Sequence, residues 1–235
     1  MSRRISDGTK IKQKRGTGHF EDYKPWININ ELSSTGTASV IKDWKHGRGV
    51  QCMSQAELMY YLLLRWDDDN IDITEQYPLP PEETDRIADS FGFRRPAHIM
   101  TTDFVCWNPG MKPHAYAVKT SLDLPKRKKE LLMIEREYWK RHDVPFNILL
   151  KENVNAVLAN NIRLVTRFYN ESAVFDHYSE IKHKIARKEY EADMSHALLD
   201  AAALEAVYDK YNKPALEDDL LKRLERNESY GRPYD

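Results

Sequence analysis

Residues 101–119 read TTDFVCWNPGMKPHAYAVK, and this stretch sets the fold class of the chain. Its first seven residues are rich in β-branched and aromatic side chains, and the Asn-Pro-Gly at 108–110 is typical of a turn. Residues 114–119 are again rich in strand formers, so the pattern predicts a β-hairpin. Side chains alternate along strands, and we expect Asp103 and Lys119 to meet at one end of this hairpin.

Helix and strand patterns alternate on both sides of the hairpin. Ser54 followed by Glu57 forms a capping box, which predicts a helix that continues to Trp66. Strands are expected over residues 71–77 and 145–150, and helices over residues 130–141 and 154–169. This mixture predicts an α/β body.

The pattern changes near residue 170, beyond which only helical spacing remains. Apolar residues predict three short helices around residues 174–185, 198–211 and 216–224. We therefore divide the chain into three parts: a basic N-terminal arm (1–24), an α/β domain (25–169) and a small helical C-terminal domain for partner or DNA contact (170–235).

The composition is that of a globular protein. The 235 residues include 31% charged and 41% hydrophobic side chains, with a net charge of −1. The longest apolar run, residues 58–64, is too short to span a membrane, and the first thirty residues lack a signal-peptide pattern. Cys52 and Cys106 have no zinc-site spacing, so we expect a reducing, cytoplasmic location.

The nearly neutral total hides an uneven distribution of charge. Residues 1–24 contain seven basic and three acidic side chains, whereas residues 151–235 contain 13 basic and 16 acidic ones. A basic arm on an acidic body is typical of a protein that contacts a polyanion with one face. The alternative is a flexible, solvated N-terminus.

Four residues could carry chemistry: Glu57, Asp103, Lys119 and Glu135. Carboxylates that gather Mg²⁺ neutralise a phosphodiester, and a nearby lysine orients the attacking water or stabilises the developing anion. An Asp and a Lys on neighbouring strands are typical of the restriction-endonuclease fold.

Each candidate also has a purely structural interpretation. The capping box alone explains Glu57, Asp103 could pair with a neighbour, Lys119 could be solvated, and Glu135 could lie on an exposed helix face. The histidines show no metal-site spacing, so we assign no histidine to a metal.

Seven short motifs, in order over about residues 10–170, resemble the TnsA family, the endonuclease subunit of heteromeric DNA transposases. They are Arg15-Gly16-Thr17-Gly18-His19, Asp22-Tyr23-Lys24-Pro25-Trp26, Ser54-Gln55-Ala56-Glu57-Leu58, Glu75-Gln76-Tyr77-Pro78-Leu79, Thr102-Asp103-Phe104, Ala117-Val118-Lys119 and Glu135-Arg136-Glu137-Tyr138-Trp139. The resemblance implies a restriction-endonuclease-like domain over residues 25–169, followed by a winged-helix-like C-terminal domain.

The resemblance also implies an activity and partners. A protein of this family nicks the 5′ strands at transposon ends, while a TnsB-type transposase cuts and joins the 3′ ends and a TnsC-type AAA+ ATPase regulates both. It implies a cytoplasmic bacterial protein that acts at the nucleoid.

Site residues follow from the same resemblance. Glu57, Asp103, the backbone carbonyl of Val118 and Glu135 are implied as ligands of Mg²⁺, for which Mn²⁺ would substitute. Lys119 is implied as the catalytic lysine. The basic arm then gains a role, in which its side chains neutralise DNA phosphates; they are Lys10, Lys12, Lys14 and Arg15. Ala117 departs from the family pattern, because it replaces a Gln or Glu and provides no oxygen ligand.

Two other functions compete with this interpretation. The chain could be a restriction or repair nuclease that acts alone, or a scaffold subunit that has lost catalysis through Ala117. A generic helical adaptor is disfavoured by the hairpin and the series of motifs.

Overall fold

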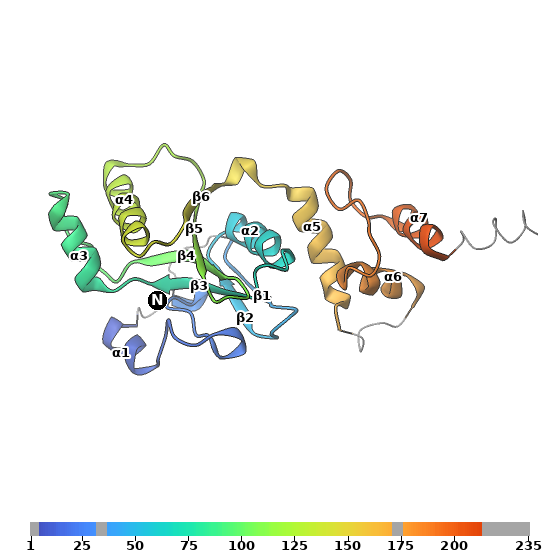
Figure 1. The fold of residues 1–235 in the computed structure, drawn as a ribbon, viewed down its shortest axis with the longest axis horizontal. Coiled ribbons are helices and arrows are strands. Elements are labelled where there is room, and N and C mark those ends of the chain that lie inside the picture. Colours follow the sequence, from blue (N-terminus) through green and yellow to red (C-terminus); the bar gives the residue numbers. More distant parts are fainter. Residues whose placement is uncertain (1–4, 32–36, 171–175, 213–235) are drawn as a thin grey trace, which may run out of the picture. The chain divides into compact units, whose positions relative to one another are not determined.

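The computed structural model describes residues 5–31, 37–170 and 176–212, and the chain folds as two compact units, Met1–Ala159 and Asn160–Asp235 (Figure 1). The division falls within helix α5 (Ala156–Val165), before the position at 169/170 that the sequence analysis chose. The two units are described separately below.

The first unit is built on a four-stranded mixed sheet in the order β3-β4-β5-β6. Its strands are β3 (Asp72–Pro78), β4 (Thr101–Trp107), β5 (Pro113–Lys119) and β6 (Phe146–Leu150). β3 and β4 are antiparallel, as are β4 and β5, whereas β6 runs parallel to β5. The predicted hairpin, both other strands and the α/β fold class are confirmed.

Helices α2 (Gln55–Trp66), α3 (Pro81–Ser90) and α4 (Lys126–Arg141) pack around this sheet. The predicted cap of α2 is present, because Ser54 Oγ accepts a hydrogen bond from the Glu57 N–H at 3.2 Å. Helix α3 was not expected from the sequence, because Pro78, Pro80 and Pro81 indicated only the end of a strand. Pro81 is its first residue, a position at which proline has no helical hydrogen bond to lose.

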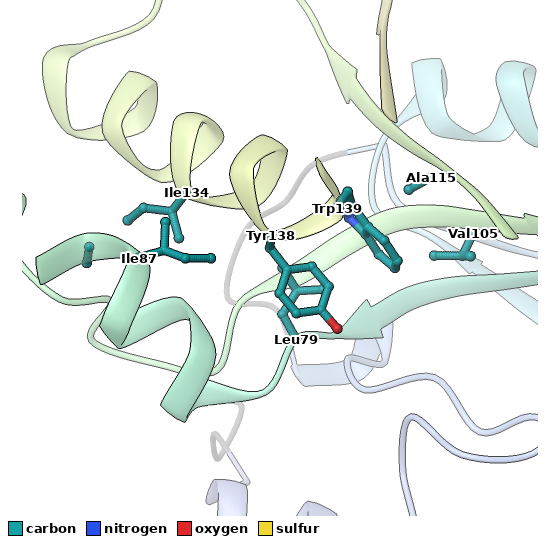
Figure 2. Close-up of a cluster of buried hydrophobic side chains, with 8 residues drawn as sticks. Leu79, Ile87, Val105, Ala115, Ile134, Tyr138 and Trp139 are labelled. Atoms are coloured by element: carbon teal, nitrogen blue, oxygen red, sulfur yellow. The ribbon is translucent and has the colours of Figure 1, made fainter. Parts of the chain in front are cut away.

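Helices α3 and α4 share an apolar core with strands β4 and β5 (Figure 2). The buried members of this core are Leu79, Ile87, Ala88, Val105, Ala115, Ile134, Tyr138 and Trp139. Full burial of each large apolar side chain contributes about 1.5–3 kcal/mol. Trp139 also donates an indole hydrogen bond to Thr102 Oγ1 at 2.8 Å, which fixes α4 against the start of β4.

The N-terminal segment is packed onto the body of the first unit. Residues 5–31 contain helix α1 (Asp7–Lys12) and two 3₁₀ turns, η1 (Phe20–Asp22) and η2 (Ile29–Glu31). Tyr23 is buried and donates its hydroxyl hydrogen to the carbonyl of Glu75 at 2.8 Å. The prediction of an arm or loop is therefore wrong for residues 5–24.

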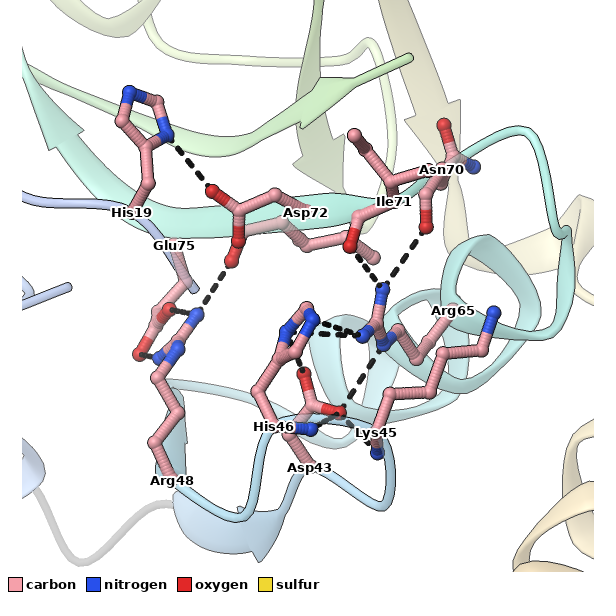
Figure 3. A network of polar contacts seen from close by, with 11 residues as sticks. His19, Asp43, Lys45, His46, Arg48, Arg65, Asn70, Ile71, Asp72 and Glu75 are labelled. Carbon is pink, nitrogen blue, oxygen red and sulfur yellow. Dashed lines mark hydrogen bonds and ion pairs between the residues drawn. The ribbon is translucent and has the colours of Figure 1, made fainter. Parts of the chain in front are cut away.

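A buried polar network joins this segment to β3 and to the hairpin of β1 (Ser39–Lys42) and β2 (Gly49–Cys52) (Figure 3). Arg65 is completely buried and pairs with Asp43 at 3.1 Å. Arg48 pairs with Glu75 at 2.7 Å. Strand β3 is thus covered on both faces, although its sequence alternates as if one face met solvent.

The second unit is helical in its described part. After α5, it contains η4 (Thr166–Phe168), α6 (His177–Ala186) and α7 (Ala201–Asn212). These helices confirm the first two of the three predicted after residue 170, whereas the third, at 216–224, lies outside the described residues. No strand occurs in residues 160–170 or 176–212, and a winged-helix-like domain stays a prediction.

The first unit also contains one further 3₁₀ turn, η3 (Lys151–Asn153), between β6 and α5.

Across the described ranges, none of the helices combines the length and the apolar character that a membrane span requires.

Candidate active site

Asp103 and Lys119 meet where β4 and β5 separate. The antiparallel pairing of these strands runs from Trp107 opposite Pro113 to Phe104 opposite Tyr116. At the next residue of β4, Asp103 Oδ2 accepts hydrogen bonds from the Val118 N–H at 2.7 Å and from Lys119 Nζ at 3.1 Å. The structure therefore brings these two residues together as the hairpin register predicted.

Lys119 is positively charged at neutral pH. Burial lowers the pKa of its ammonium group, but the nearby carboxylates of Asp103, Glu135 and Glu57 raise it more, so the pKa lies above its ordinary value. Nζ also donates to the Val118 carbonyl at 3.1 Å. Lys119 can therefore donate hydrogen bonds to an anion or a water, and it is unsuited to act as a general base.

Glu57 completes the capping box and also lines a cavity. Its Oε2 accepts from the Met53 N–H at 2.9 Å and its Oε1 from Ser54 Oγ at 3.1 Å, which completes the start of α2. The same side chain lines a cavity of the first unit, together with Lys119. Burial and the negative charge of Asp103 raise the pKa of Glu57 to about 7.

Glu135 is only 5% exposed, so its interpretation as part of an exposed helix face is wrong. It lines the same cavity, and its Oε1 finds no hydrogen-bond partner in the described part of the chain. Burial and the charge of Asp103 raise the pKa of Glu135 to about 8. A sequence signal for this burial exists, because Leu131, Ile134 and Trp139 surround Glu135 at helical spacing.

The cavity has a volume of about 970 Å³ and is open to solvent on one side. Its wall includes three of the candidate residues, Glu57, Lys119 and Glu135, and Val118 lines it as well. A concave site with convergent polar groups and perturbed pKa values is typical of an active site.

The residues present fit a divalent cation whose coordination shell is completed by oxygens of the substrate. Within the described ranges, no group of three His, Cys, Asp or Glu side chains forms a ready-made metal site. Mg²⁺ usually takes one or two carboxylates and fills its other positions with waters and phosphate oxygens. The unpartnered buried oxygen of Glu135 and the raised pKa values of Glu57 and Glu135 indicate an excess of buried negative charge, which a divalent cation would relieve.

Two of the four predicted DNA-contacting residues are placed elsewhere. Lys10 is 5% exposed and forms an ion pair with Glu31 at 3.3 Å, and Arg15 pairs with the other oxygen of Glu31. Both side chains therefore hold the N-terminal segment together, and the prediction that Lys10 and Arg15 contact DNA phosphates stays a prediction. Lys12 and Lys14 are exposed, and their role stays a prediction.

The raised pKa of Glu135 gives a testable pH dependence. In the folded state this carboxyl keeps its proton up to about pH 8, whereas the unfolded chain loses it near pH 4.5. The folded state therefore binds more protons between these values, and the free energy of unfolding falls as pH rises through them. Glu135→Gln removes this cost, and we expect it to raise the free energy of unfolding at pH 8 by about 2 to 4 kcal/mol.

Urea unfolding from pH 5 to pH 9, without divalent cations, measures this effect. Glu137→Gln is the matched control, because Glu137 lies on the same helix and its pKa is lowered by Arg141. It should leave the wild-type slope unchanged. Equal pH slopes for the wild type and Glu135→Gln would show that Glu135 ionises freely.

Comparison with known proteins agrees with this geometry. Residues 67–151 match the family model described as TnsA-like endonuclease N terminal, a range that contains Asp103, Lys119 and Glu135 but not Glu57. The chain is also 35% identical over 161 residues to the Transposon Tn7 transposition protein TnsA of Escherichia coli.

That match covers 65% of this chain and 59% of the relative, so the chain spans less than two thirds of the relative's length. The family-model match lies over the mixed sheet and α4, which carry the Asp103–Lys119 pair and Glu135. The sequence motifs, the α/β fold and these two matches support the assignment of this chain to the TnsA family.

Proposed function

We propose that the chain is a metal-dependent DNA endonuclease subunit of a transposase, which nicks the 5′ strands at transposon ends. The observation that carries this proposal is the contact between Asp103 and Lys119 at 3.1 Å, beside a cavity lined by Glu57 and Glu135. Nicking is the hydrolysis of one phosphodiester bond, which requires an activated water and stabilisation of a negatively charged transition state.

The side chains divide this work. Asp103 and Glu57 would hold the cation, and the Val118 carbonyl would offer a further oxygen. A bound Mg²⁺ or Mn²⁺ neutralises phosphate charge and lowers the pKa of a coordinated water. Lys119, whose pKa is raised, donates hydrogen bonds to the attacking water or to the developing anion.

Glu135 takes the place of the ligand that Ala117 lacks. Ala117 is completely buried in β5 and has no side-chain oxygen. Glu135 lines the same cavity and has an unpartnered buried oxygen, which makes it the available substitute. Its raised pKa means that the proton must leave before the oxygen can bind a cation, so metal affinity should increase from pH 7 to pH 8.5.

The partners belong to the same proposal. A TnsB-type transposase cuts the 3′ ends, a TnsC-type AAA+ ATPase regulates the reaction, and the complex acts on double-stranded DNA in the bacterial cytoplasm. The similar protein of Escherichia coli is named a transposition protein, which supports this proposal.

A nicking assay on end-labelled transposon-end DNA tests the proposal, with and without the partner transposase and with Mg²⁺, Mn²⁺ or a chelator. We expect 5′-strand nicks that need both a divalent cation and the partner. Efficient cleavage by the chain alone would instead identify a restriction or repair nuclease. Normal double-strand excision with the Asp103→Ala variant would identify a scaffold subunit.

A further inference from the structure

The cavity extends beyond the acidic residues into a basic region. This region is walled by the loop before β4, by the loop after β5 and by the first turns of α4. Three of its lining side chains are cationic: Arg94, Arg127 and Lys128. A cavity that offers several cations besides the carboxylates near Lys119 suits a ligand that carries several phosphates.

Arg127 has a structural role within this wall. It donates hydrogen bonds to the carbonyls of Arg94 and Arg95 at 2.7 and 2.9 Å and pairs with Glu130 at 3.1 Å. These bonds fasten the start of α4 to the loop before β4. They use the backbone of Arg94, so truncating the Arg94 side chain leaves this fastening in place.

Arg94 and Lys128, in contrast, are exposed, and neither side chain forms an ion pair or hydrogen bond with any described residue. Lys128 belongs to four consecutive basic residues, 126–129, at the N-terminus of α4, where the first turn contains no acidic residue. Cations are unfavourable at this end of a helix because the helix dipole is positive there. A bound anion would relieve this repulsion.

The helical spacing relates Lys128 to the acidic residues. Lys128, Leu131, Leu132 and Glu135 all line the cavity, so this face of α4 runs along it. Seven residues of helix separate Lys128 from Glu135, which is about 10 Å along the axis at 1.5 Å per residue. A DNA strand advances about 3.4 Å per nucleotide, so this length corresponds to about three nucleotides.

We propose that Arg94 and Lys128 bind backbone phosphates of the DNA strand that is cut, about three nucleotides from the phosphate that reacts. This inference rests on the proposed function and adds the residues that position its substrate. Contacts of this kind set affinity and register and do not read the base sequence. Asp123 and His98 also line this region.

The chain provides matched controls for a test. Arg95 and Lys129 are the sequence neighbours of the proposed residues, but neither lines the cavity, and Arg95 is paired with Asp89 at 2.7 Å. Arg94→Ala/Lys128→Ala and Arg95→Ala/Lys129→Ala each remove two positive charges. Both are made in full-length chains that also carry Asp103→Asn, so that binding is measured without cleavage.

The experiment measures fluorescence anisotropy of a labelled transposon-end duplex between about 50 and 300 mM salt. We expect Arg94→Ala/Lys128→Ala to weaken binding about tenfold near 100 mM salt and to reduce the slope of log affinity against log salt by about 1.8, since two phosphate contacts are lost. The control pair should change this slope by less than about 0.5. Equal slope changes for both pairs, or no change for either, would overturn the inference.

A second measurement locates the contacts. A neutral methylphosphonate placed about three nucleotides from the nick should weaken binding of the protein with Arg94 and Lys128 intact, and should have no further effect on Arg94→Ala/Lys128→Ala. Additive effects of the two changes at every phosphate tested would overturn the inference. A protein that shows the expected slopes but never nicks DNA would contradict the proposed function and leave this inference standing.

Discussion

Asp103→Asn should reduce DNA nicking by at least about 100-fold. The carboxylate of Asp103 accepts from the Val118 N–H at 2.7 Å and from Lys119 Nζ at 3.1 Å. The amide oxygen of asparagine can still accept from Val118, so the strand ends should keep their places. The negative charge that pairs with Lys119, and that we propose binds a cation, is lost.

The size of this effect follows from the position of Asp103 between the other charged groups. The negative charge of Asp103 raises the pKa of Glu57, Glu135 and Lys119. All three side chains therefore interact electrostatically with Asp103 at short range in a poorly solvated environment. Removing the charge therefore changes the metal ligand and the protonation of its neighbours together.

Asp123→Asn is the matched control for this prediction. Asp123 lines the cavity beside which Asp103 lies, is exposed and undergoes the same substitution, so nicking should stay within about threefold of wild type. Nicking is measured on end-labelled DNA with the partner transposase, and thermal unfolding verifies that each variant is folded. The assignment is falsified if Asp103→Asn retains nicking comparable to that of Asp123→Asn.

Arg65→Met should have the largest effect on stability, a loss of about 3 to 5 kcal/mol in the free energy of unfolding. Arg65 is fully buried, pairs with Asp43 at 3.1 Å and donates to the carbonyls of Asn70 and Ile71 at 2.9 and 3.0 Å. Methionine fills much of the volume but leaves Asp43, itself 1% exposed, as a buried charge without its main partner.

The charge on Asp43 explains why the loss is so large. Burial raises the pKa of this carboxyl, but Arg65 and the N–H groups of Lys45 and His46 lower it more, so Asp43 is ionised at neutral pH. Its stabilising contribution is present above the unfolded pKa of 3.8 and is lost as pH falls through the lower folded value. Without Arg65, the ionised form becomes unfavourable in the interior.

Urea unfolding at pH 7 measures the change, with Arg95→Met as the control. Arg95 also forms an ion pair, with Asp89 at 2.7 Å, but its side chain is 62% exposed, so we expect little change. Adding Asp43→Asn to Arg65→Met should recover at least about 1.5 kcal/mol, because the buried charge is then removed. Similar losses for Arg65→Met and Arg95→Met, or no recovery in the double variant, would contradict the role of the buried pair.

The features that the sequence predicted are those that depend on local chemistry. The turn at 108–110 and the strand formers around it fix the hairpin, and Ser54 with Glu57 fixes the start of α2. Because a strand alternates its side chains and the turn sets the register, even the contact between Asp103 and Lys119 could be predicted.

The features that the sequence did not predict depend on contacts between distant residues. Lys10 and Arg15 read as a free basic arm, because nothing local shows that Glu31 pairs with both. Glu135 was expected to be exposed because Arg136 and Glu137 follow it directly, although the apolar residues around it at helical spacing indicated burial. Charged residues in the interior are fixed by their partners, which periodicity does not identify.

Glu57 combines two properties in one side chain. Its carboxylate accepts the Met53 N–H ahead of the first turn of α2 and also lines the cavity, and its pKa is about 7. Protonation near neutrality therefore weakens a helix cap and removes a negative charge from the cavity in a single event. A substitution of Glu57 would change the start of this helix and the charge of the cavity together.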